Sequence, residues 1–206
     1  MLVNLADKVS SQSTAILVID IQNDFCADDG FYGKMGSNVK VIQNMVPRLE
    51  QFIEKGREAN VPIIFIRANY DEVYLSDSMR LRRTMNNISP TLTTGSWGAN
   101  FYHIRPLDKD PIIDKHRYNA FTGTALNQVL NNLGVATVIC TGTATNVCLE
   151  STARDAFFHD YNVVIVDDCS ATPYGQDFHD MTLKNCKLTY GEVCNSEELI
   201  NIWQQE

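Results

Sequence analysis

The sequence predicts an α/β fold, with a mostly parallel, Rossmann-like sheet of six strands and helices on both of its faces. Two observations predict this fold. Short apolar runs rich in β-branched residues recur along the chain, as expected for strands buried on both faces. Segments with apolar residues at helical spacing lie between these runs. Such alternation of strands and helices is typical of a parallel sheet, and we expect one domain over residues 1–206.

The order of elements follows from these patterns and from the breakers between them. The expected strands are 15–19, 61–66, 111–114, 135–140, 162–166 and a short one near 187–193. The expected helices are 38–55, closed by Gly56, then 76–85, 122–133, 147–160, 176–186 and a last one from about 196. Residues 86–110 contain several proline and glycine breakers and are expected to be irregular. A loop of this length is typical of a lid or pocket wall, and contact with another subunit is the alternative.

Composition excludes several classes of function. The formal net charge of −8 argues against nucleic acid or an anionic membrane as a partner. No apolar run approaches the ~20 residues of a membrane span. The first residues do not resemble a secretory signal peptide, so a reducing cytoplasm is the expected location. The six cysteines are then expected to be free thiols: Cys26, Cys140, Cys148, Cys169, Cys186 and Cys194.

The segment from Val135 to Ala156 indicates a buried strand, a tight turn and a helix with Cys148 in its first turn. A thiol at this place feels the positive end of the helix dipole, which is expected to lower its pKa and favour the thiolate. Cys148 is therefore a candidate nucleophile. The alternative is that Cys148 is a small buried hydrophobic residue, as most free cysteines are.

Polar residues stand at the ends of three expected strands. Asp20 follows the first strand, Lys115 the third, and Cys148 lies across the turn after the fourth. Ligands of parallel α/β proteins bind beyond the carboxyl ends of the strands, so the three side chains are expected to share one crevice. Asp20 would take the thiol proton of Cys148, which would attack a carbonyl, while Lys115 would hold Asp20 ionised. Alternatively, Asp20 caps a turn and Lys115 is a solvated surface lysine.

Three motifs together resemble the isochorismatase-like cysteine hydrolases, and the resemblance covers roughly residues 13 to 195. The motifs are Val18-Ile19-Asp20-Ile21-Gln22-Asn23-Asp24-Phe25, Lys115-His116-Arg117-Tyr118 and Thr141-Gly142-Thr143-Ala144-Thr145-Asn146-Val147-Cys148. The resemblance implies a three-layer α/β/α fold and a triad of base, electrostatic partner and nucleophile at Asp20, Lys115 and Cys148. It also implies a cis peptide between Thr143 and Ala144, with the amides of Ala144 and Cys148 as an oxyanion hole. The implied reaction is attack on an amide carbonyl, release of ammonia or an amine, and hydrolysis of the acyl-enzyme.

Within the family, the chain most resembles the ureidoacrylate amidohydrolases and related hydrolases of carbamoyl groups, such as N-carbamoylsarcosine and biuret hydrolases. Nicotinamidases of the family bind a metal through an Asp and two His after the second strand, whereas residues 67–74 contain no histidine. We therefore expect no metal and no cofactor. The departure from the ureidoacrylate enzymes is Ala68-Asn69-Tyr70, where those enzymes place an Asn and a Trp in the substrate pocket. This difference bears on the substrate more than on the reaction.

Six residues are candidates for binding the substrate. Phe25, Tyr70, Trp97 and Tyr118 are expected to wall the pocket, and the alternative for each is a place in the core. Asn23 is expected to hydrogen-bond near the base. Arg117 would hold a substrate carboxylate, pair with Asp114 or point outward. Asp24 is expected to support local structure.

Two further expectations concern assembly and function. The family resemblance implies a homodimer or homotetramer, and the basic helix face at Arg80, Arg82 and Arg83 is either solvated or covers a neighbouring subunit's site. The expected function is a cysteine-dependent amidohydrolase acting on a small ureido or carbamoyl compound. A nicotinamidase-type or other small-amide hydrolase is one alternative. A thiol-based sensor or binding module that keeps the fold is the other.

Overall fold

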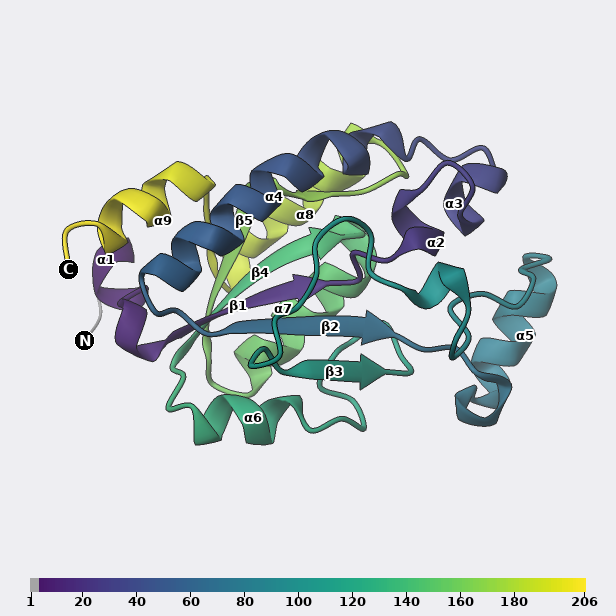
Figure 1. The fold of residues 1–206 in the computed structure, drawn as a ribbon, viewed down its shortest axis with the longest axis horizontal. Helices are drawn as coiled ribbons and strands as arrows, with labels where there is room; N and C mark the ends of the chain where they lie inside the picture. Colours follow the sequence, from purple (N-terminus) through teal and green to yellow (C-terminus); the bar gives the residue numbers. More distant parts are fainter. Residues whose placement is uncertain (1–3) are drawn as a thin grey trace.

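The computed structural model describes residues 4–206 and contains a six-stranded sheet in the order β3-β2-β1-β4-β5-β6, in which every neighbouring pair is parallel (Figure 1). The strands are β1 (Thr14–Ile19), β2 (Ile63–Ala68), β3 (Ile112–Lys115), β4 (Thr137–Thr143), β5 (Asn162–Ala171) and β6 (Glu192–Cys194). Their arrows in Figure 1 point toward α2 (Asn23–Cys26), α3 (Phe31–Lys34) and α5 (Asp77–Met85). The predicted parallel six-stranded sheet is confirmed.

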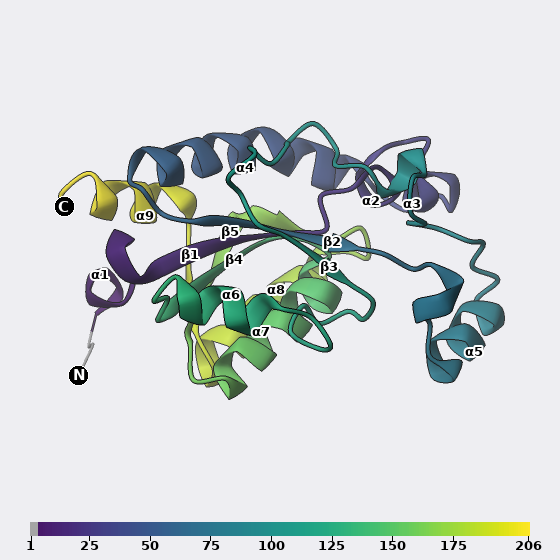
Figure 2. The same cartoon turned by 60° about the horizontal axis from the view of Figure 1, so that its bottom comes forward.

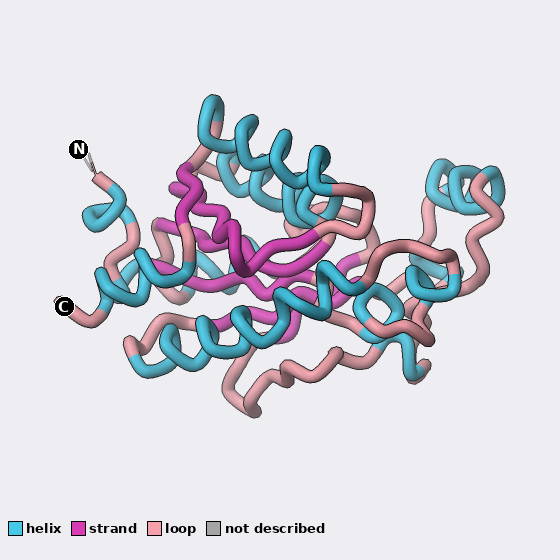
Figure 3. The backbone as a smooth tube through the Cα atoms, turned by 90° about the horizontal axis from the view of Figure 1, so that it is seen from above, coloured by secondary structure: helices cyan, strands magenta, loops and turns pink. Residues whose placement is uncertain are grey.

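Helices cover both faces of this sheet. Figure 2 shows α4 (Lys40–Glu58) and α9 (Ser196–Trp203) on one face, with α6 (Leu126–Asn132), α7 (Glu150–Phe158) and α8 (Gln176–Thr189) on the other. Figure 3 shows the same arrangement from above, with the strands between the helical layers. The predicted three-layer α/β/α architecture is therefore confirmed.

The central strand β1 shows why the sheet needs two layers. All six of its residues are buried, and successive side chains enter opposite cores. Ile16 and Val18 pack with residues of α4 and α9, whereas Leu17 and Ile19 pack with residues of α6, α7 and α8. A strand that is apolar on both faces can be covered only by an element on each side.

The long helix α4 extends beyond its expected end. Its apolar positions recur at helical spacing and face the core, but the helix continues past Gly56 to Glu58. Gly56 lies where α4 approaches β1 closely: a Cβ atom there would be 2.6 Å from Cδ1 of Ile16. The expectation that Gly56 closes the helix was wrong, because this glycine permits close packing.

Several other elements differ in extent from their expected ranges. The helix expected over 122–133 begins only at Leu126, because Asn119 and Thr124 hold the preceding residues in turns through side-chain hydrogen bonds. Helix α8 continues to Thr189, so the last strand is confined to residues 192–194. Strand β5 continues to Ala171 after a shift in its register with β4 near Gly142.

Several short elements complete the fold. A short helix, α1 (Leu5–Lys8), lies near the C-terminus, at the opposite end of the molecule from α3 and α5 (Figure 1). Short 3₁₀ turns occupy Ser11–Ser13, Glu72–Tyr74 and Trp97–Ala99. The irregular segment between α5 and β3 contacts the sheet end through an isolated antiparallel bridge between Phe101 and Gln22. Over residues 4–206, no helix has the length and apolar character that crossing a membrane requires.

Candidate active site

The strand order brings three chemically active side chains to one edge of the sheet. Asp20 directly follows β1, Lys115 is the last residue of β3, and Cys148 lies in the turn that follows β4. Strand β1 is flanked by β2 and β4, and β3 lies next to β2. Because all of these strands are parallel, their carboxyl ends meet at the same edge, as the sequence predicts.

Asp20 and Lys115 form a buried ion pair. Lys115 Nζ lies 2.8 Å from Asp20 Oδ2, and both side chains are completely buried. Asp20 has a left-handed backbone conformation with φ of 55°, while its amide still donates to the carbonyl of Ile66. Lys115 Nζ also donates to the carbonyl of Arg117 at 3.0 Å. The expectation of a solvated lysine does not hold, because this ammonium is enclosed by its partners.

The chain that carries Cys148 folds into an unusual turn. The peptide bond between Thr143 and Ala144 is cis, as the family resemblance implied. Residues Thr145–Leu149 then form one turn of π-helix that leads into α7, where an α-helix was expected from residue 147. The carbonyl of Ala144 accepts from the amides of Val147 and Leu149, which lie on either side of Cys148.

The predicted lowering of the Cys148 pKa is wrong in direction. Burial raises the pKa of this thiol, and the nearby Asp20 raises it further, while Lys115 acts in the opposite direction. The side chain is only 5% exposed, and loss of hydration is the largest of these effects. The resting thiol is therefore protonated and needs a base.

The buried pair supplies such a base. The pKa of the Asp20 carboxyl is raised on balance, because burial raises it by more than Lys115, the Cys148 thiol and the backbone of Ala68 lower it. Burial lowers the pKa of Lys115, but Asp20 and Cys148 together raise it by more, so that Lys115 remains an ammonium. A protonated thiol thus lies beside a carboxylate that an ammonium holds in place. This arrangement allows proton transfer from sulfur to oxygen.

Tyr70 has a buried hydroxyl group. Its side chain is 6% exposed, and its hydroxyl has no hydrogen-bond partner anywhere in residues 4–206. Burial raises the pKa of this hydroxyl, and so do Cys148, Asp20 and Tyr118, while Arg83 lowers it. The guanidinium of Arg83 lies 5.6 Å from the centre of the Tyr70 ring. Tyr118 itself is half exposed.

Two tyrosines that interact with Cys148 were not predicted from the sequence. Tyr32 lies on α3 and Tyr174 in the segment after β5. Their hydroxyl oxygens are 2.9 Å apart and share a hydrogen bond. Burial raises the pKa of both hydroxyls, and Cys148 contributes to the shift in each case. Neither residue belongs to a motif, and α3 has too few residues to show a periodicity, so the sequence offers no signal that would have found them.

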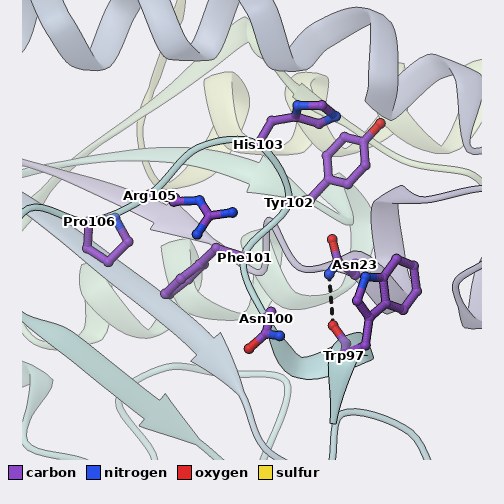
Figure 4. Close-up of a pocket in the computed structure, with 8 residues that line it drawn as sticks. All are labelled: Asn23, Trp97, Asn100, Phe101, Tyr102, His103, Arg105 and Pro106. Atoms are coloured by element: carbon purple, nitrogen blue, oxygen red, sulfur yellow. Dashed lines mark hydrogen bonds between the residues drawn. The ribbon is translucent and has the colours of Figure 1, made fainter. Parts of the chain in front are cut away.

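Asn23 and Trp97 line a separate cavity of about 740 Å³ (Figure 4). Its walls are Asn23, Trp97, Asn100, Phe101, Tyr102, His103, Arg105 and Pro106. Asn23 Nδ2 donates to the carbonyl of Trp97 at 2.8 Å, and the Trp97 side chain is 52% exposed. The three triad residues are not among the residues that line this cavity. Phe25 is buried in the core, with its ring 5.1 Å from that of Tyr32.

The remaining candidates have structural partners. Arg117 donates to the carbonyls of Tyr74 and His116, at 3.0 and 2.6 Å. Asp114 pairs instead with Arg67, so the alternative pairing of Arg117 with Asp114 was wrong.

Asp24 joins two distant parts of the chain. Its carboxylate accepts from the amide of Phe31 at 3.2 Å and from the amide of Leu92 at 2.8 Å. The contact with Phe31 is the local structural role expected of Asp24, whereas the contact with Leu92 is long-range and was not expected. Within the part of the chain that the structure describes, no three His, Cys, Asp or Glu side chains gather as metal ligands.

Comparison with known proteins places this site in a family. The isochorismatase domain model matches residues 14–198, which include the whole sheet and all three triad positions. The chain belongs to the isochorismatase family. The predicted family and the prediction of a hydrolase within it are thus confirmed.

Relatives of this isochorismatase-family protein include curated amidohydrolases and solved structures. It is 26% identical to the ureidoacrylate amidohydrolase RutB of Acinetobacter baylyi, over 97% of this chain and 87% of that one. A cysteine hydrolase from Pseudomonas syringae pv. phaseolicola has a TM-score of 0.84 at 25% identity, covering 100% of this chain and 96% of that one. The N-carbamoylsarcosine amidase of Thermoplasma acidophilum has a TM-score of 0.73 at 24% identity, covering 90% and 97%.

Proposed function

We propose that this isochorismatase-family protein is a cysteine-dependent amidohydrolase that cleaves a C–N bond of a small ureido or carbamoyl compound. The observation that supports this most directly is the completely buried pair of Asp20 and Lys115, joined at 2.8 Å beside the Cys148 thiol. Burying two charges is costly, and a thiol-based sensor would not need it. A base held ionised next to a protonated thiol is what acyl transfer through sulfur requires.

The reaction begins with proton transfer. Asp20 takes the thiol proton as Cys148 Sγ attacks the substrate carbonyl, and the amides of Ala144 and Cys148 donate to the developing oxyanion. The intermediate collapses as Asp20 returns this proton to the leaving nitrogen, and ammonia departs. Water then attacks the thioester, giving one proton to Asp20, and the thiolate leaves and takes that proton back. Lys115 keeps Asp20 charged whenever it must act as a base.

The substrate class rests on relatives and on the residues around the nucleophile. The ureidoacrylate amidohydrolase and the N-carbamoylsarcosine amidase named above support a ureido or carbamoyl group as the reacting end. We propose that Tyr70 and Tyr118 contact this end, since Cys148 and Tyr118 both raise the pKa of the Tyr70 hydroxyl. Phe25, Trp97, Asn23 and Arg117 remain proposed contacts for more distant parts of the substrate. We further propose a cytoplasmic homodimer or homotetramer.

Ammonia release from purified protein tests the proposal. The panel is ureidoacrylate, N-carbamoyl amino acids, biuret, nicotinamide and simple aliphatic amides. We expect turnover of a ureido or carbamoyl member, abolished by Cys148→Ala and by Asp20→Asn. Cys194→Ala is the matched control, because Cys194 is an equally buried thiol that lies in β6, away from the triad. This variant should retain activity.

Two results would contradict the proposal. Turnover of nicotinamide alone would assign the protein to a different substrate class. Equal activity of Cys148→Ala and wild type would show that the thiol is not the nucleophile. Mass spectrometry of protein mixed with a turned-over substrate and quenched with acid supplies direct support, as the acyl group should be found on Cys148.

A further inference from the structure

A buried histidine that belongs to none of the family motifs quoted above contacts the turn that carries the nucleophile. His179 lies on α8 and is 6% exposed. Its Nδ1 lies 2.9 Å from the hydroxyl of Thr145, and its Nε2 lies 2.9 Å from Oδ1 of Asp167. Thr145 is completely buried and is the first residue of the π-helical turn that contains Cys148. We infer that His179 is a positioning residue that fixes this turn through Thr145, an inference that rests on the proposed amidohydrolase function.

The partners of the imidazole determine which nitrogen carries its proton. A carboxylate only accepts hydrogen bonds, so Nε2 donates to Asp167. In the neutral ring Nδ1 then accepts, and the Thr145 hydroxyl donates to it. Asp167, whose side chain is 56% exposed, thus orients a buried ring whose other nitrogen holds the threonine.

The position of Thr145 explains why this contact matters for chemistry. Thr145 directly follows Ala144, whose amide is one proposed donor to the oxyanion, and precedes Cys148 by three residues. A shift of the turn would move the oxyanion donors and the sulfur together. A misplacement of about 1 Å in a catalytic group can cost about 10²-fold in rate.

Two further hydrogen bonds hold this turn and the start of α7. Asn146 Oδ1 accepts from Thr172 at 2.6 Å, and Glu150 Oε2 accepts from Thr182 at 3.0 Å. Along the chain, Asn146 and Glu150 are both farther from Ala144 than Thr145 is. Attachment of α8 does not depend on the imidazole, because Leu183 and Cys186 anchor this helix in the core. A role in positioning is therefore separable from a role in folding.

Two substitutions of His179 separate its two hydrogen bonds. An asparagine amide lies near the place of Nδ1, so His179→Asn keeps a partner for Thr145 and loses Asp167. A glutamine amide reaches the place of Nε2, so His179→Gln keeps Asp167 and loses Thr145. Using ureidoacrylate or whichever panel compound is turned over, we expect His179→Gln to lower kcat by about 10²-fold with little change in KM. His179→Asn should stay within about tenfold of wild type, because the positioning contact remains.

A second pair of variants tests the same contact from the other side. Thr145→Ser keeps the hydroxyl and should behave like wild type, whereas Thr145→Val removes it and should match His179→Gln. Combining Thr145→Val with His179→Gln should cost little more than either alone, since both remove one interaction.

Alkylation of Cys148 by iodoacetamide provides a readout that needs no substrate. We expect His179→Gln and Thr145→Val to slow alkylation by about tenfold or more, because the sulfur moves away from its base. Lack of turnover by wild type would count against the proposed function, while the alkylation rates would still decide the role of His179. Wild-type kcat and alkylation in folded His179→Gln and Thr145→Val would overturn the inference. If His179→Asn and His179→Gln lose kcat equally, and the loss parallels a fall in thermal stability, His179 has a purely structural role.

Discussion

The buried pair of Asp20 and Lys115 makes a quantitative prediction about stability. Replacing Lys115 with Met leaves a carboxylate buried without a cation, and replacing Asp20 with Asn leaves an ammonium without an anion. Removing one partner of a buried pair costs about 3–5 kcal/mol of unfolding free energy. The double variant buries an amide and a thioether of similar size and no charge, so it should be more stable than the sum of the two losses implies.

The magnitude follows from the geometry. At the observed 2.8 Å, two unit charges attract by about 6 kcal/mol at an effective dielectric constant of about 20. Independent single losses would sum to about 6–10 kcal/mol. We expect the double variant to lose only about 2–4 kcal/mol, because only the neutral polar group remains unpaired. The coupling energy, the difference between these two figures, is then about 2–8 kcal/mol.

Urea titrations of the four proteins, followed by circular dichroism and tryptophan fluorescence, measure this coupling. The exposed pair Lys55–Glu58, at 2.6 Å, is the matched control, and its cycle should give less than about 1 kcal/mol. Additivity of the Asp20 and Lys115 losses within about 0.5 kcal/mol would refute the reasoning. All three variants of the buried pair should lose ammonia release, including the double variant whose stability partly recovers.

Three further predictions follow from other features. Burial raises the pKa of all six thiols above the unfolded value of 9.0, so above about pH 9 the unfolded state loses protons that the folded state keeps. The unfolding free energy from urea titrations under reducing conditions should therefore fall as pH rises from 8 to 10, by up to ~1.4 kcal/mol per pH unit for each thiol, and a constant value would contradict this. Tyr70→Phe should raise KM several-fold without loss of stability, since the removed hydroxyl has no partner in residues 4–206. Tyr190→Phe, which removes another buried hydroxyl near Cys186, should leave KM unchanged, and the substrate role of Tyr70 fails if both variants behave alike. Gly142→Ala should destabilise the protein by at least about 2 kcal/mol, because φ is +107° and a Cβ would lie 2.1 Å from the carbonyl oxygen of Ile19; a thermal unfolding midpoint equal to that of wild type would contradict it.

The sheet was predictable because its strands are nearly continuous apolar runs. The expected strand 15–19 differs from β1 by only one residue. The agreement is close because the apolar run continues without interruption up to Asp20. Strand β5 was predicted to stop at Val166, because two aspartates follow. In the fold these carboxylates have partners from other elements: Asp167 accepts from His179, and Asp168 accepts from Ser196. Partners that come from distant parts of the chain leave no local signal.

The positions of Asp20, Lys115 and Cys148 at one sheet edge were predictable for a different reason. Asp20 directly follows β1, Lys115 ends β3 and Cys148 lies in the turn after β4, and strand ends can be located approximately from sequence. The protonation states of these residues were not predictable, because the direction in which the pKa of the Cys148 thiol shifts depends on how completely the turn is buried. The π-helical turn and the contact from Tyr32 to Tyr174 were also missed, since each depends on how separate segments pack.

The order of strands has a consequence for biogenesis. Strand β1 is synthesised early but pairs with β4, whose first residue follows it by more than a hundred positions. During translation, Asp20 is therefore synthesised long before Cys148, its thiol partner. Strand pairs this distant in sequence slow folding, because the entropy of closing the intervening loop is lost before the strand contacts form. Recovery of enzyme activity should thus be among the last signals to return during refolding, after helical circular dichroism.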